Sequence, residues 1–181
     1  MNRFRHTLLG FECAIPPGWV ELPVAWARKA SLSASATSEK LGALLKASSD
    51  EPFLNLSLPQ TDPFLSVPMI RCTSKPQDAV QRAGGPDEVI DAAIARVEGA
   101  YPDFRVVQRL SPYLVAGASG ACARMNMTVL NEQGTRFPCQ SELIVLQTAR
   151  CCLIMGLTGP ADPDEGLSAD FELFVRSIRL S

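Results

Sequence analysis

Apolar and polar residues alternate from Ala121 to Val129, where the odd positions are apolar and the even ones are mostly polar. Alternation with period two is the signature of a β-strand with one buried face. A second strand-like segment runs from Phe137 to Leu146, and a third, apolar one from Cys151 to Leu157. The stretch from Ala121 to Thr158 therefore predicts three consecutive antiparallel strands. The third is apolar on both faces at its start, so we expect it to be central in the sheet.

A three-residue loop between the first two segments, 132–134, fixes how they pair. It puts Gly134 where a residue with positive φ is needed. With this loop, polar residues face polar ones and apolar residues face apolar ones, whereas a slip by one residue would turn every side chain to the wrong face. The predicted pairs are Arg124 with Glu142, Asn126 with Gln140, Val129 with Phe137, Met127 with Cys139, and Ala123 with Leu143.

The same patterns predict the remaining elements. Strands are expected at 11–15, 20–22, 53–58, 64–73 and 104–110, and a glycine-bearing connection at 115–120. Pro68 indicates an edge strand or a bulge. Gly84-Gly85-Pro86 with the acids that follow is typical of a helix start. A last helix presents an apolar face of Leu167, Phe171, Phe174, Val175 and Ile178.

Runs of strands interrupted by two helices predict an α+β fold, in which an antiparallel sheet is flanked by helices. A chain of 181 residues fits a single domain, 1–181. A Ser/Ala-rich stretch at about 25–50, from Ala25 to Asp50, looks like an insertion. It is interpreted either as a mobile surface segment or as a helix offered to a partner.

Composition narrows the function classes. With a net charge of −2, the chain lacks the excess of basic residues that is typical of nucleic-acid-binding proteins. No apolar run is long enough for a membrane helix, so stable membrane insertion is not expected. The N-terminus begins basic like a signal peptide, but its apolar run is short and Glu12 interrupts it, which predicts a cytoplasmic protein.

The six cysteines and the single histidine, His6, bear on chemistry. Most of the cysteines occupy strand positions that are compatible with burial, so we expect reduced, structural thiols. Because no C-x-x-C spacing is present, no metal site or other cofactor is expected. Catalysis is not expected either, because the acidic cluster at 162–165 is interpreted as a helix cap and no histidine base accompanies a cysteine. A small hydrolase stays as the alternative.

One sheet face is the candidate site because it mixes polar and apolar residues. Its polar members are Arg124, Asn126, Gln140 and Glu142, and its apolar members are Ile144, Leu146, Cys152 and Ile154. Such a face could be an open surface that holds another polypeptide, which would make the protein a chaperone, an adaptor or a general assembly factor. Alternatively, a helix of the same chain covers it.

The chain resembles the PsbP-like family, which includes a nuclear Ran-binding nucleotide-release factor and many small bacterial proteins. The features that carry the resemblance are Phe11-Glu12-Cys13-Ala14-Ile15-Pro16-Pro17-Gly18-Trp19, Tyr101-Pro102-Asp103-Phe104, Val115-Ala116-Gly117 and Phe171 to Ile178. The resemblance implies an antiparallel sheet between helices and a binding or assembly role rather than catalysis. The chain is also similar to the Eag chaperones of type VI secretion, which implies that an apolar helix of a secreted effector binds the sheet face, with a homodimer as a further expectation.

Overall fold

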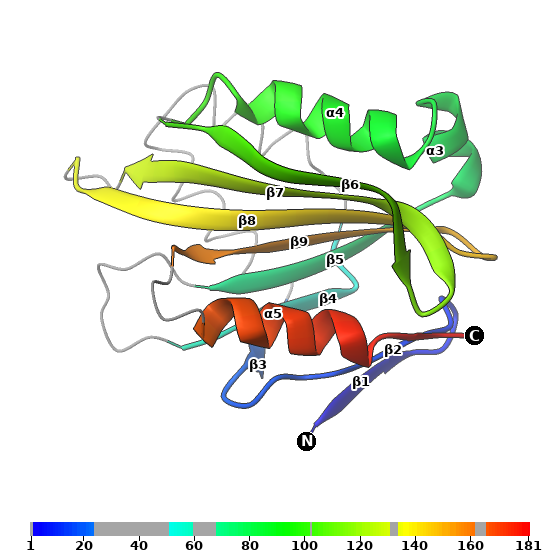
Figure 1. The fold of residues 1–181 in the computed structure, drawn as a ribbon. Helices are drawn as coiled ribbons and strands as arrows, with labels where there is room; N and C mark the ends of the chain where they lie inside the picture. The colour runs from blue at the N-terminus through cyan, green and yellow to red at the C-terminus, as the bar shows by residue number, and fades with distance from the viewer. Residues whose placement is uncertain (1, 24–50, 60–67, 102, 131–133, 162–165) are drawn as a thin grey trace.

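The computed structural model describes residues 2–23, 51–59, 68–101, 103–130, 134–161 and 166–181 (Figure 1). The insertion expected at about 25–50 and the acidic cap at 162–165 lie outside the described residues. In chain order the elements are β1 (Arg3–His6), β2 (Phe11–Ala14), β3 (Val20–Glu21), β4 (Leu54–Ser57), β5 (Met69–Lys75), α3 (Gln77–Arg82), α4 (Pro86–Val97), β6 (Arg105–Val115), β7 (Ala118–Leu130), β8 (Arg136–Gln147), β9 (Cys152–Pro160), α5 (Gly166–Ser177) and β10 (Arg179–Leu180).

A seven-stranded antiparallel sheet in the order β3-β4-β5-β9-β8-β7-β6 forms the centre of the fold (Figure 1). β1, β2 and β10 make a second, three-stranded antiparallel sheet. α4 lies on one face of the large sheet and α5 on the other, as Figure 1 shows. The α+β class expected from the sequence is therefore confirmed.

The predicted register of the β7–β8 hairpin is confirmed at every pair that the sequence indicated. Gly134 has a φ of 77°, in the region that favours glycine. The expectation that the third strand is central is confirmed as well, because β9 has three strands on each side. A period-two pattern with one buried face determines pairing so well because any slip exposes apolar side chains.

The main core lies between the sheet and α5. Phe171 and Phe174 of α5 pack there with Ile144, Leu146 and Met155 of the sheet, and all five side chains are buried. Trp19 belongs to this core, where its ring lies 6.0 Å from that of Phe171, and its Nε1 donates to Oδ2 of Asp170 at 2.9 Å. The apolar face predicted for the last helix is confirmed for Leu167, Phe171, Phe174 and Val175, and Ile178, directly after the helix, is buried too.

A smaller core lies under α4, which begins with Pro86 at its first position and with acids in its first turn, as the sequence predicted. Ile90 of α4 packs on Ala121, Ala123 and Val145. Arg109 of β6 fastens the helix start to the sheet, because its Nη2 donates at 2.9 Å to both the carbonyl and the carboxylate of Asp87.

Some expectations were wrong. The connection at 115–120 is a two-residue turn, Ala116–Gly117, with φ of 50° and 82°, so β6 and β7 extend almost to each other. β5 is an internal strand and Pro68 precedes it, so that proline marks no edge. β1, α3 and β10 were not predicted.

Candidate binding groove

A groove of about 1030 Å³ opens between α5 and the outer half of the sheet face that α5 covers. α5 packs over the apolar part of this face, and strands β6, β7 and β8 continue beyond the part it covers. The lining includes Tyr113, Arg124, Asn126 and Gln140 from the sheet and Glu172 and Arg176 from α5. The groove thus combines one helical wall with a floor of strand side chains.

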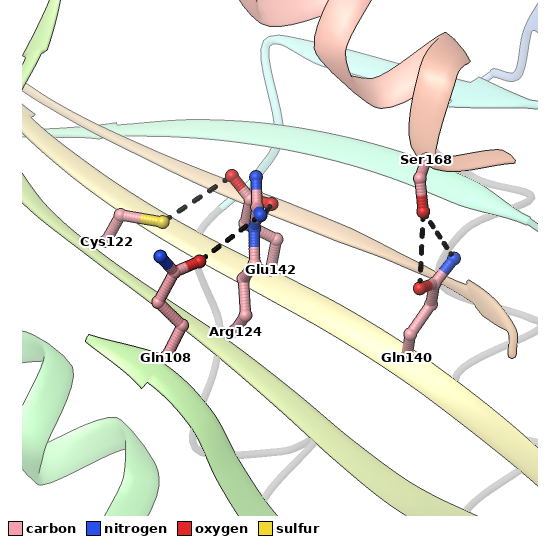
Figure 2. Close-up of polar contacts among 6 residues, drawn as sticks. All are labelled: Gln108, Cys122, Arg124, Gln140, Glu142 and Ser168. Atoms are coloured by element: carbon pink, nitrogen blue, oxygen red, sulfur yellow. Dashed lines mark hydrogen bonds and ion pairs between the residues drawn. The ribbon is translucent and has the colours of Figure 1, made fainter. Parts of the chain in front are cut away.

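An ion pair occupies the floor of the groove. Nε of Arg124 donates to Oε2 of Glu142 at 2.7 Å, and Nη1 donates to Oε1 of Gln108 at 3.2 Å (Figure 2). The Glu142 side chain is only 11% exposed, whereas that of Arg124 is 52% exposed. The hydrogen bond to Glu142 raises the pKa of Arg124, which therefore stays protonated.

Cys122 lies beside this pair, with its Sγ 3.5 Å from Oε1 of Glu142 (Figure 2). Burial, reinforced by the Glu142 carboxylate, raises the pKa of the Cys122 thiol from 9.0 to about 12. Burial and the same carboxylate raise the pKa of Tyr113 from 10.0 to about 12. Both groups are neutral at physiological pH, so Cys122 is not set up as a thiolate nucleophile.

Gln140 joins the floor to the helical wall. Its Nε2 lies 3.3 Å and its Oε1 3.5 Å from Oγ of Ser168, near the start of α5 (Figure 2). The contact is exposed to solvent, and each partner has both donor and acceptor atoms. This contact bridges the two sides at one end of the groove and helps to define its width.

Four of the seven site residues that the sequence predicted line the groove, and the other three do not. Arg124, Asn126, Gln140 and Glu142 all line the groove. Ile144 and Leu146 share that sheet face but are 0% exposed, because α5 packs over them. Ile154 lies opposite Val145 and packs in the cluster under α4, so its assignment to this face was wrong. Cys152 was misplaced in the same way, since it lies two residues from Ile154 on the same strand.

Four further residues of the site were not predicted. Gln108 and Tyr113 come from β6, and Glu172 and Arg176 come from the exposed side of α5. The expected strand ends at Leu110 and the expected connection begins at Val115, so Tyr113 belongs to neither. Glu172 and Arg176 stand four residues apart and form an ion pair, a helical spacing that was visible in the sequence.

Within the described ranges, no three histidine, cysteine or acidic side chains gather closely enough to hold a metal ion. Nor does any described helix have the length and apolar character needed to cross a membrane. All six cysteines are buried, as the strand pattern predicted.

Comparison with known proteins shows the fold. No protein-family model matches the chain, and no curated protein matches it by sequence. Among solved structures it is similar to the cyanobacterial PsbP protein (CyanoP) of Synechocystis, with a TM-score of 0.55 and 12% identity over 99% of this chain and 92% of that one. The chain therefore has the PsbP-like fold that the sequence features indicated.

Two further solved structures are similar at lower TM-scores. LpqN of Mycobacterium tuberculosis, described as involved in cell envelope biogenesis, has a TM-score of 0.48 and 14% identity over 94% of this chain and 83% of that one. The Ran-binding protein Mog1p of Saccharomyces cerevisiae has a TM-score of 0.47 and 8% identity over 99% of this chain and 94% of that one.

Proposed function

We propose that the protein is a non-catalytic polypeptide-binding module, a chaperone or adaptor, which holds a segment of a partner protein in the groove between α5 and strands β6–β8. The observation that supports this proposal is the groove itself, an open hollow of about 1030 Å³ with fixed polar groups on its floor. Small-molecule sites are mostly apolar and bury most of the ligand. An open groove with charged side chains along it suits a chain segment better.

Exposed apolar side chains on β6 support the same proposal. Val107 is 58% exposed and Leu114 is 70% exposed, and both line the groove. Burying one aliphatic side chain contributes roughly 1.5–3 kcal/mol, so a few such contacts offset part of the ordering entropy of association. The partner would contact these residues and the polar floor, since α5 already packs over Ile144 and Leu146.

Two finer forms of the proposal concern the partner. The similarity to Eag chaperones makes an apolar helix of a type VI secretion effector one candidate occupant, and a homodimer another. One measurement separates the two candidate occupants. A second copy in the groove would make the mass measured by analytical ultracentrifugation depend on protein concentration, whereas an effector would not.

A hydrolase is the rival function, and the surroundings of the cysteines speak against a thiol mechanism. Cys139 is 1% exposed, packs with Met125 and Met127, and is not itself part of the groove lining. Burial and Glu142 keep the Cys122 thiol protonated. Loss of a hydrolytic activity in Cys139→Ser or Cys122→Ser would nevertheless favour the rival function.

Site-specific photo-crosslinking tests the proposal. A photoreactive phenylalanine at Asn126, inside the groove, is expected to capture a partner polypeptide in the cells that produce the protein. The matched control is the same residue at Arg96, which is exposed on α4 across the sheet. Capture should be lost in Ala169→Trp, which fills the groove, and kept in Ala95→Trp on α4, since both alanines are exposed. Equal capture from both positions, or none from Asn126, would overturn the proposal.

A further inference from the structure

The Arg124 side chain is held by two hydrogen bonds and keeps further N–H groups that can donate to a ligand. Of its five N–H groups, Nε–H bonds to Glu142 and one on Nη1 bonds to Gln108. No acceptor among the described residues takes the other three. About half of the side chain faces solvent in the groove. A guanidinium held by two side chains loses little conformational entropy when it binds a further acceptor.

The neighbouring acidic groups offer no comparable site for a cation. Oε2 of Glu142 accepts from Arg124, its Oε1 lies beside the Cys122 thiol, and its side chain is nearly buried. On the helical wall, Glu172 accepts from Arg176 in an exposed pair four residues apart. The hydroxyl of Tyr113 is neutral and can donate. The Arg124 guanidinium and the Tyr113 hydroxyl can therefore still donate to a ligand on the floor of the groove, whereas the nearly buried carboxylate of Glu142 already accepts from Arg124.

Resting on the proposed function, we infer that Arg124 is the anchor for an acidic side chain, an Asp or a Glu, of the bound segment. A guanidinium matches a carboxylate geometrically, and the resulting charge-assisted hydrogen bonds are about twice as strong as neutral ones. Arg124 lies partway along the groove, with Asn126 towards one end and Val115 towards the other. A segment that runs through the groove passes over Arg124, which favours an internal acidic side chain rather than a chain end.

The test uses random-sequence peptides displayed on phage and selected on the purified full chain. Peptides are kept only if they bind the wild type and Ala95→Trp but not Ala169→Trp, in which the groove is filled. We expect the retained peptides to share one acidic position. Replacing it by Asn or Gln should weaken binding about 10-fold or more, which corresponds to the loss of a charged hydrogen bond. Binding of the acidic peptides should also weaken as salt rises.

Substitutions of the protein complete the test. Arg124→Gln combined with Glu142→Gln keeps a hydrogen-bonding pair without a buried unpaired charge, and it should weaken the acidic peptides about 10-fold while leaving their Asn or Gln forms unaffected. Arg124→Lys should recover part of the affinity, because lysine keeps the charge but lacks the planar fork. Arg96→Gln on α4 removes one exposed positive charge elsewhere and should change nothing.

The outcomes separate the two proposals. If groove-dependent peptides are retained but share no acidic position, or bind the double variant equally well, the role of Arg124 is wrong and the polypeptide-binding groove stands. If no peptide depends on the groove, both proposals fail. Unfolding curves of every variant ensure that a loss of binding is not a loss of folding.

Discussion

Arg124 and Glu142 lie directly opposite each other in the β7–β8 ladder, and Nε of the arginine donates to Oε2 of the glutamate at 2.7 Å. The pair is asymmetric, because the carboxylate is nearly buried while the guanidinium is half exposed. Removing the arginine would leave an uncompensated charge on the nearly buried carboxylate. Removing the glutamate would leave a guanidinium that water can still solvate. The arginine thus neutralises the glutamate while facing the groove.

Arg124→Ala should lower the free energy of unfolding by about 1–3 kcal/mol, because Glu142 loses its charged donor within the fold. The measurement is chemical denaturation at neutral pH. Arg136→Ala is the matched control, since Arg136 also belongs to the hairpin and pairs with Asp103, but both side chains are well exposed. Its loss should be below about 1 kcal/mol. Equal losses in the two variants would contradict the burial argument.

Ile144→Asp should destabilise the fold by about 3 kcal/mol or more, because it puts a carboxylate without a counter-charge into the core beneath α5. Thermal melting measures the effect. Leu114→Asp is the control, because Leu114 is 70% exposed at the edge strand β6 and its loss should stay within about 0.5 kcal/mol. An unchanged melting temperature in Ile144→Asp would mean that α5 does not cover the face.

Gly134→Ala should cost about 1 kcal/mol, because Gly134 has a φ of 77°, which an L side chain rarely adopts. A Cβ at this position would meet nothing within 4 Å, so the cost would come from the backbone alone. Gly156→Ala in β9 has equally open surroundings without positive φ, and it should be neutral or slightly stabilising. Equal melting temperatures for the two variants would show that the hairpin tolerates another turn.

Where the sequence alternates with period two, it determined both the strands and their register. The β7–β8 hairpin, and with it the contact of Arg124 with Glu142, followed from the match of face polarity through a three-residue loop that ends in Gly134. β9 is apolar on both faces, so its pattern contained no register, and Ile154 was assigned to the wrong face for that reason. Buried central strands lack the alternation that would reveal which residues share a face.

The remaining errors come from non-local packing and from short elements. That α5 covers Ile144 depends on a contact between distant parts of the chain, which the helix pattern implied without naming the face it would cover. β10 has two residues and exists only through its pairing with β2. β6 passes through Pro112 with two irregularities of register, so no alternation extended the strand to Tyr113.

Asn55→Leu should raise the free energy of unfolding by about 1 kcal/mol. Asn55 is 2% exposed in β4, and neither Nδ2 nor Oδ1 has a hydrogen-bond partner within the described part of the chain. A leucine of similar size removes the desolvation penalty of the buried amide. Asn126→Leu is the control, because the amide of Asn126 lies in the open groove and stays hydrated. If Asn55→Leu destabilises the fold, the amide has a partner after all.

The free energy of unfolding should fall as pH rises from about 9 towards about 12. Burial raises the pKa of Cys13 and of Cys122 from 9.0 to about 12 in the folded chain. Between these values the unfolded chain loses thiol protons that the folded chain retains, so ionisation favours unfolding, by up to about 1.4 kcal/mol per pH unit for each group. Below pH 9 both states keep the proton and the stabilisation is complete.

Denaturation curves across this alkaline range measure the slope of the free energy of unfolding against pH. Cys122→Ser isolates the contribution of one thiol to that slope. Serine does not titrate there, so the slope should become shallower by the share of one group, whatever the substitution does to the stability at neutral pH. Comparing slopes rather than absolute stabilities removes the packing effect of the substitution from the argument. An unchanged slope in Cys122→Ser would mean that water reaches the thiol beside Glu142, and the case against Cys122 as a nucleophile would then lose its physical basis.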